Sequence, residues 1–148
     1  GSYTHLDTAF SNFFTPAGFR PPDGGAGTGG DRTGNPLRNA PDKAYNVLVR
    51  YYMGLSNGGS LTWQADFRHK DIVYQDPDVF EFAAVPEYDV VDLRVSYVWP
   101  KGNLETTLWS RNANDESYFL HNWPLQGSGQ ATPAPPRTYG VTFTWTND

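Results

Sequence analysis

The sequence predicts an all-β protein, an antiparallel up-and-down meander of about six strands. Three observations predict this fold class. Six segments alternate apolar and polar residues with a period of two, the pattern of a strand with two different faces. Aromatic residues make up 16% of the chain, and 15 Gly and 12 Pro separate the alternating segments. Long runs with helical periodicity are missing from the sequence.

Length and composition limit the classes of protein further. A chain of 148 residues has the length of one domain, and we expect a single β-barrel segment over 1–148. The chain has no Cys, which excludes a disulfide scaffold, a thiolate metal site and a Cys nucleophile. A net charge of -5 argues against a nucleic-acid partner. The sequence has no apolar run of about 18 residues for a spanning helix, but short alternating strands are still compatible with a spanning barrel.

The first three expected strands lie near 2–11, 44–53 and 60–69. Alternation is weakest in the first. In the second, the residues from Tyr45 to Met53 at odd positions are apolar or aromatic, while the even positions include a charge. The third alternates in the same way, from Leu61 onward.

The last three expected strands lie near 88–98, 103–111 and 137–146. Val, Leu and Tyr on one side of the fourth oppose Asp, Arg and Ser on the other. The fifth has Leu and Thr against charged residues and a Trp. In the sixth, aromatic and Val side chains alternate with Thr and Gly.

The two faces of these strands differ strongly in polarity. The apolar faces end in aromatic residues, and the opposite faces carry charge. This combination fits a barrel with lipid outside and water inside. A sandwich with one face in a dry core produces the same alternation, so periodicity alone leaves both architectures open. In the barrel interpretation, the charged residues expected to face the lumen are Arg50, Asp66, Arg68, Asp92 and Arg94.

Connection lengths favour the membrane barrel. Long loops are expected at 12–43, 70–87 and 112–136, whereas 54–59 and 99–102 are short turns. Three loops of that length are unusual in a compact domain. Outer-membrane barrels, in contrast, combine short turns at one rim with long loops at the other.

Three motifs occur in order along the chain: Asn-Pro followed by Pro at 35–41, Arg-Asn-x-x-Asp-x-x-Tyr at 111–118, and Pro-Arg-Thr-Tyr-Gly at 136–140. With the strands between them, they resemble the C-terminal part of the β-barrel of TonB-dependent outer-membrane receptors. The resemblance covers nearly the whole chain. It implies the bacterial outer membrane as location, membrane lipid and a small-molecule ligand as partners, and uptake of an iron–siderophore complex or similar nutrient. The loop residues expected to contact that ligand are Tyr74, Phe80, Tyr118, His121 and Trp123.

The chain is short for such a receptor. The barrel of that family has about 22 strands and a plugged lumen, and even the smallest lipid-facing barrel needs about eight. Three explanations stay open: a fragment of a longer receptor, a homo-oligomer that closes the barrel, or a soluble barrel with its apolar face inward. In the third, the free-standing domain binds a small ligand or acts as a promiscuous hydrolase.

Catalytic signals are weak. The sequence has no nucleophile elbow and no phosphate-binding glycine motif, and we expect no cofactor. His5 and Asp7 share one face of the first expected strand, but two ligands are too few to specify a metal, so we expect no metal site. We lean against an enzyme, and a hydrolase is the class to expect if there is one. Its candidate residues would be His121, Asp115, Ser117 and His5.

Overall fold

The computed structural model describes residues 1–16, 29–125 and 128–147. It is all-β apart from one short 3-10 helix, and no helix in these ranges is long and apolar enough to cross a membrane. In chain order, the elements are β1 (Ser2–His5), β2 (Phe14–Thr15), β3 (Gly30–Asp31), β4 (Lys43–Gly54), β5 (Ser60–Lys70), η1 (Glu81–Ala83), β6 (Tyr88–Val98), β7 (Leu104–Arg111), β8 (Phe119–Leu125), β9 (Ser128–Pro133) and β10 (Thr138–Trp145).

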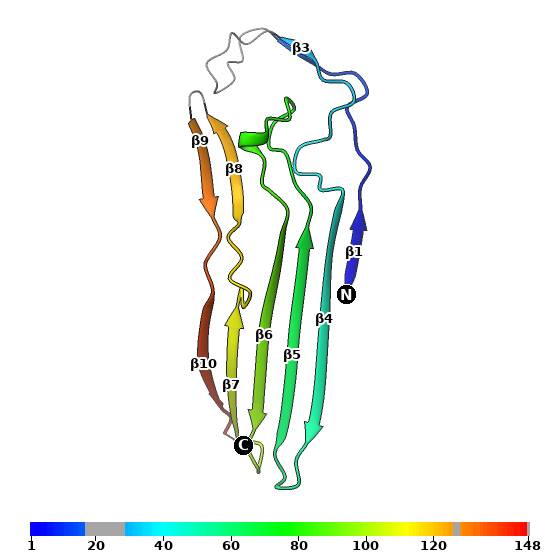
Figure 1. Ribbon diagram of the computed structural model, residues 1–148. Helices are drawn as coiled ribbons and strands as arrows, with labels where there is room; N and C mark the ends of the chain where they lie inside the picture. Colours follow the sequence, from blue (N-terminus) through cyan, green and yellow to red (C-terminus); the bar gives the residue numbers. More distant parts are fainter. Residues whose placement is uncertain (17–28, 126–127, 148) are drawn as a thin grey trace.

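Six of these strands form the main sheet, in the order β1-β4-β5-β6-β7-β10, with every neighbouring pair antiparallel (Figure 1). Strands that are neighbours in this sheet follow one another in the chain, apart from the two small hairpins β2–β3 and β8–β9. The predicted all-β class and six-stranded antiparallel meander are confirmed.

Short turns close one end of the sheet, and the long connections gather at the other (Figure 1). Between β4 and β5, Gly58 adopts a φ of 84° and donates its N–H to the carbonyl of Leu55 over 3.0 Å. Glycine suits this position because left-handed backbone costs it nothing. The turn between β6 and β7 uses Lys101 and Gly102 in the same conformation, at φ 86° and 78°.

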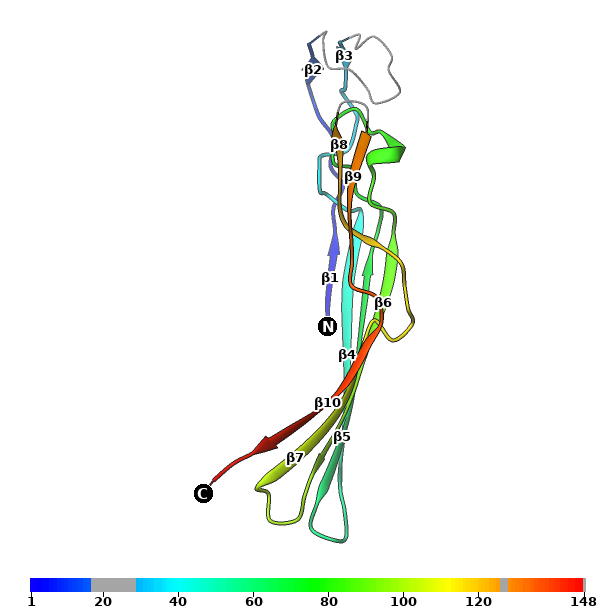
Figure 2. The same ribbon diagram turned by 90° about the vertical axis from the view of Figure 1, so that its left-hand side faces the viewer.

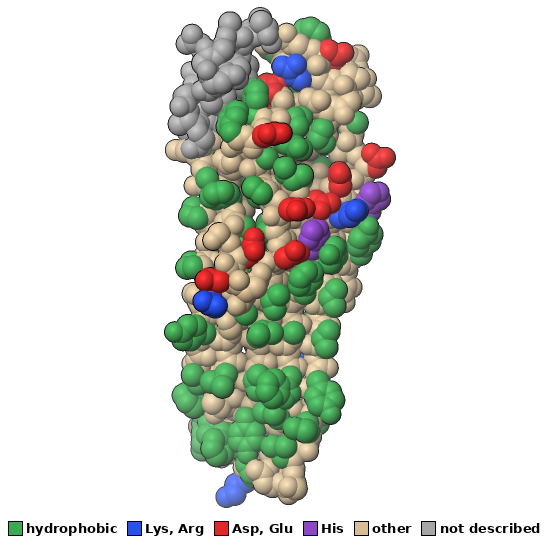
Figure 3. Space-filling model, in the orientation of Figure 1, with side chains coloured by type: hydrophobic (Ala, Val, Ile, Leu, Met, Phe, Trp, Pro, Cys, Tyr) green, Lys and Arg blue, Asp and Glu red, His purple; other side chains and the backbone are tan. Residues whose placement is uncertain are grey.

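One face of the sheet is apolar and uncovered. Register places Val49, Ala65 and Leu93 side by side on it, and Trp63 and Phe143 are 50% and 70% exposed. Figure 3 shows apolar side chains spread over this face of the lower strands. Seen edge-on in Figure 2, the sheet bends away from this face toward the opposite, polar one. The apolar side chains of the main strands therefore do not form a dry core within the described residues.

The buried apolar residues lie instead at the loop end. They are Val73, Ala83, Ala84, Val85 and Val90. Val73 and Val85 form an isolated antiparallel bridge with N–H to carbonyl distances of 3.0 and 2.9 Å. This small core fixes the segment between β5 and β6 against the top of the sheet.

Three segments differ in detail from the sequence expectations. The first strand ends at His5 instead of continuing to residue 11. The expected loop 112–136 contains the hairpin β8–β9, and the loop 12–43 contains the short pair β2–β3, with 17–28 outside the described residues. The hairpin was missed because a proline, Pro124, lies within the β8 sequence and because β9 is polar and contains glycine, so neither segment shows clear alternation.

A tryptophan lying against a glycine joins β7 to β10. Trp109 is the cross-strand partner of Gly140, and its indole Nε1–H donates to Thr142 Oγ1 over 3.1 Å. A Cβ atom on Gly140 would lie 2.5 Å from Cζ2 of Trp109. The missing side chain therefore provides the space that the indole occupies.

We expect Gly140→Ala to lower the free energy of unfolding by about 1–3 kcal/mol, because the indole must move and loses its bond to Thr142. Urea denaturation followed by far-UV circular dichroism measures this change. Gly54→Ala is the matched control, since a Cβ there meets nothing within 4 Å. A cost for Gly140→Ala that persists undiminished in a Trp109→Ala background would contradict this explanation.

Candidate functional site

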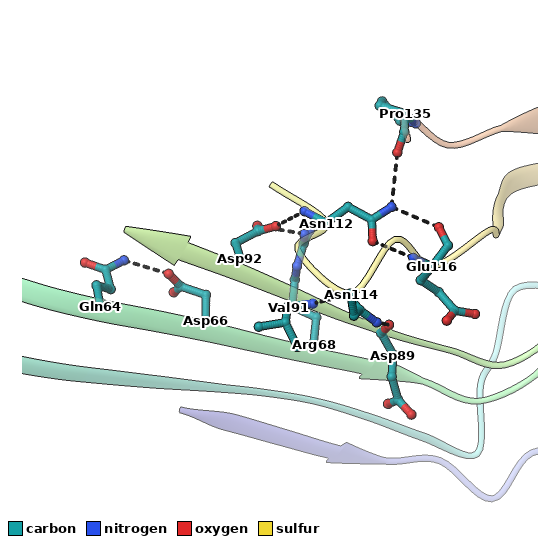
Figure 4. Close-up of polar contacts among 10 residues, drawn as sticks. All are labelled: Gln64, Asp66, Arg68, Asp89, Val91, Asp92, Asn112, Asn114, Glu116 and Pro135. Carbon is teal, nitrogen blue, oxygen red and sulfur yellow. Dashed lines mark hydrogen bonds and ion pairs between the residues drawn. The ribbon is translucent and has the colours of Figure 1, made fainter. Parts of the chain in front are cut away.

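The polar face of the sheet carries a network of hydrogen-bonded side chains. Register aligns Arg50, Gln64 and Arg94 across three strands, and Leu48, Asp66 and Asp92 in the next row. Arg50 donates from Nε and Nη2 to Gln64 Oε1 over 3.0 and 2.7 Å. Gln64 in turn donates to Asp66 over 2.7 Å, as Figure 4 shows. The five residues predicted to face a lumen all lie on this polar face.

A shallow hollow of about 410 Å³ lies over the middle of this face. Its walls combine carboxylates, guanidinium groups, hydroxyls and an indole from strands β5, β6, β7 and β10. The lining residues are Gln64, Asp66, Asp92, Leu93, Arg94, Glu105, Thr107, Trp109, Ser110, Arg111, Thr142 and Thr144.

Asp92 links the polar face to the loop end. Its Oδ2 accepts a hydrogen bond from Arg68 Nη2 over 2.9 Å, and its Oδ1 accepts from the backbone N–H of Asn112 over 2.8 Å. Asn112 is buried, with 4% of its surface exposed. Its side chain accepts a hydrogen bond from the N–H of Glu116 and donates to the carbonyls of Glu116 and Pro135. Figure 4 shows this group of contacts where β7 leaves the sheet.

A second asparagine extends the pairing of β6 beyond the end of β7. The Asn114 side chain accepts from the N–H of Val91 over 3.0 Å and donates to the carbonyl of Asp89 over 2.7 Å (Figure 4). An amide group imitates a strand backbone in this arrangement. Asn112 and Asn114 together determine where the chain toward β8 leaves the sheet.

The predicted ligand-contact residues lie at the loop end, and four of them belong to three separate stacked pairs. Tyr118 stacks on Tyr88 with ring centroids 4.3 Å apart, and His121 stacks on Trp123 at 5.6 Å. Phe80 stacks on Phe82, and the carbonyl of Tyr74 accepts from the N–H of Asn39. These contacts do not join the five residues into one cluster.

Asn122 brings two of those pairs into one region. It is buried and donates to the carbonyls of Phe82 and Ala84 over 2.8 and 3.0 Å, which docks β8 on the η1 segment. His121 and Trp123 flank Asn122 in β8, so they face the other side of the strand.

The weak catalytic candidates have other partners. Asp115 accepts from the backbone N–H and Nη2 of Arg137 over 3.2 and 3.3 Å. His5 Nδ1 lies 3.0 Å from the carbonyl oxygen of Asp42. Within the described residues, no hydrogen bond connects His121 to Asp115 or Ser117. A hydrolase built on these residues stays a prediction.

Two features of the site were missed at the level of sequence. His69 lies between two carboxylates, with Nδ1 2.8 Å from Asp89 and Nε2 3.0 Å from Asp71. Trp109 and Arg111 belong to an expected strand, but their proximity to Arg94 and Gly140 depends on the strand register. Among the loop acids, burial raises the pKa of Asp76 above its usual 3.8.

An open antiparallel sheet with one exposed apolar face, one hydrogen-bonded polar face and long loops at one rim is the architecture of a section of a membrane β-barrel. Solved structures of two receptors share it. The siderophore receptor PiuA from Acinetobacter baumannii matches 95% of this chain with a TM-score of 0.70 and 26% identity. The ferric yersiniabactin uptake receptor FyuA from Yersinia pestis matches 77% with a TM-score of 0.68 and 17% identity.

The chain corresponds to a small part of these receptors, 18% of the first and 17% of the second. No protein-family model and no curated protein matches the sequence. The likeness to TonB-dependent receptors that the motifs indicated is confirmed at the level of fold.

Proposed function

We propose that this chain is a section of the wall of an outer-membrane receptor that takes up an iron–siderophore complex or a similar small nutrient. In this function the apolar face contacts lipid, the polar face lines the lumen, and the loop end captures the ligand. The single observation that carries the proposal is the exposed apolar face, on which Val49 and Phe143 are 61% and 70% exposed, opposite the hydrogen-bonded polar face.

The open edges of the sheet support a larger assembly. β1 and β10 each pair on one side only in the main sheet. An unpaired strand edge in lipid costs several kcal/mol for each unsatisfied backbone group. The wall section therefore needs further strands, either from the rest of a longer receptor or from other copies of this chain.

The loop end supplies the surface for ligand capture. Tyr74, Phe80, Tyr118, His121 and Trp123 are the residues proposed to contact the ligand. They lie in or beside the segments that the Val73–Val85 bridge and the Asn122 bonds hold in place. Aromatic side chains on a fixed scaffold are typical of binding surfaces.

Behaviour with and without lipid tests the proposal. We expect the chain to aggregate in buffer and to acquire the circular dichroism spectrum of a β-sheet in detergent micelles or phosphatidylcholine liposomes, because the apolar face needs hydrocarbon. Light scattering measures the aggregation, circular dichroism measures the β-sheet content, and protease protection in liposomes measures the insertion. A monodisperse, β-rich monomer in buffer would instead favour a soluble domain. In micelles, a fixed number of copies above one would identify self-association as the source of the missing strands.

A further inference from the structure

Both ring nitrogens of His69 contact carboxylates at the place where β5 ends and β6 begins. Nδ1 lies 2.8 Å from a carboxylate oxygen of Asp89, the cross-strand partner of His69, and Nε2 lies 3.0 Å from a carboxylate oxygen of Asp71. An ionised carboxylate can only accept a hydrogen bond, and a neutral imidazole carries a single N–H. Both contacts are hydrogen bonds only if each ring nitrogen carries a proton. The geometry therefore fits the positively charged imidazolium form of His69.

The His69 contacts lie at the neck of the connection between β5 and β6, the place where the two ends of that connection meet. Asp71 is its first residue, and Asp89 is the second residue of β6, so one imidazolium joins the two ends. The Val73–Val85 bridge is a further link between the same two segments, with N–H to carbonyl distances of 3.0 and 2.9 Å. Because β5 is paired on both sides in the main sheet, these contacts do not involve the open edges of the sheet.

A tyrosine holds the His69 ring from the side of β4. The ring stacks on Tyr45 with centroids 4.7 Å apart, and 15% of the His69 side chain is exposed. Partial burial makes its ion pairs stronger than fully exposed ones. The other titratable neighbours lie on β1, β4, β5 and β6: His5, Lys43, Arg68, Lys70 and Tyr88. The three on β5 and β6 point to the opposite face of the sheet, so the charged groups that contact the ring in the described structure are the two carboxylates.

We propose that His69 is a pH-operated clasp at the neck of the connection between β5 and β6. The imidazolium binds Asp71 and Asp89 together. When pH rises and His69 gives one proton to the solvent, the neutral ring keeps a single N–H and releases one carboxylate. Since the charged ring has two partners in the folded chain that it lacks when unfolded, the clasp stabilises the neck at weakly acidic and neutral pH and is lost at alkaline pH. The clasp stands on this geometry alone. In the proposed function, it makes the loop that carries Tyr74 and Phe80 sensitive to pH.

Nitrogen-15 NMR of the folded full chain, in micelles or in buffer if the chain is soluble there, tests the protonation of the ring. His69→Gln identifies the His69 signals by their loss. At pH 7 we expect similar chemical shifts for the two ring nitrogens, the signature of an imidazolium, and by pH 9 the unequal shifts of a neutral ring. Asp71→Asn and Asp89→Asn should each lower the pH of this change by about one pH unit, because each removes a charge-assisted contact.

Glu87→Gln is the matched control for these two variants. It neutralises an exposed acid of the same connection, and exposed charges that make no close contact interact weakly. The pH at which His69 titrates should therefore move by less than about 0.3 pH unit in this variant.

Hydrogen exchange of the Val73 and Val85 amides tests the effect on the loop. Relative to the intrinsic exchange rate at each pH, their protection should be about tenfold lower at pH 9 than at pH 7. In His69→Gln it should be equally low at both pH values, because Gln does not titrate. A neutral His69 at pH 7, a ring that keeps both protons at pH 9, an equal shift in Glu87→Gln, or unchanged protection of the two amides would overturn the clasp. A monodisperse monomer in buffer would contradict the proposed function but not the clasp, so the two can fail separately.

Discussion

Val49→Arg is expected to abolish or strongly reduce insertion of the chain into liposomes. Val49 lies at the middle of β4 on the apolar face, and 61% of its surface is exposed. An Arg on the lipid face near the bilayer midplane costs roughly 2–4 kcal/mol. Protease protection of liposome-inserted chain measures the insertion yield. The same substitution on a water-exposed strand would change stability little, so the experiment reports directly on the environment of this face.

Leu48→Arg is the matched control for that experiment. Leu48 is the adjacent residue on the same strand, is 47% exposed, and lies on the polar face beside Asp66. A charge there stays hydrated in a water-filled lumen and can pair with the nearby carboxylate, so the insertion yield should be close to that of the unchanged chain. Equal yields for the two variants would mean that the two faces share one environment, and would contradict the assignment of lipid and lumen.

Asn112→Ala is expected to lower the free energy of unfolding by about 2–4 kcal/mol. The substitution removes the buried Asn112 amide and leaves three backbone groups of Glu116 and Pro135 without their side-chain partner. It also places Ala at a φ of 51°, where only Gly, Asn and Asp are readily accommodated. Urea denaturation followed by circular dichroism measures the change. The hairpin β8–β9 should become more sensitive to protease at the same time.

Asn112→Gly separates the two contributions. Glycine adopts the positive φ without cost but removes the same side chain. The difference between the Ala and Gly variants therefore measures the backbone part, expected to be about 1 kcal/mol, and the remaining loss measures the hydrogen bonds. A stability of Asn112→Gly equal to that of the unchanged chain would show that the side-chain bonds contribute nothing.

The central strands could be predicted because their signal is local. In β4, β5 and β6, neighbouring residues point to opposite faces of the sheet. A difference in environment between the faces therefore produces an alternation of apolar and polar residues along the sequence. β8 and β9 could not be predicted in the same way, because these two strands pair with each other and β8 also contacts η1. Asn122, a polar residue in the middle of β8, is buried and donates hydrogen bonds to two backbone carbonyls. No sequence pattern reveals these contacts.

The candidate site was likewise predicted only in part from the sequence. Alternation placed Arg94 and Asp92 on the polar face, and the motif at 111–118 marked Asn112, but neither indicated which side chains meet. Arg94, Trp109 and Gly140 are brought side by side by the register of β6, β7 and β10. The loop aromatics were predicted as ligand contacts, which stays a prediction, and only the structure shows that Phe80, Tyr118 and His121 belong to three separate stacked pairs.

By itself, the sequence determined the polarity of the two faces, the positions of the five long strands of the main sheet and the end of the sheet at which the long loops lie. These properties depend on neighbouring residues and on the lengths of connections. Only the tertiary structure decided which face is left uncovered, where the small buried core forms, and that two arginines flank Trp109. These properties depend on contacts between residues far apart in the chain. A shift of one residue in the register of a strand would move each of its side chains to the opposite face of the sheet.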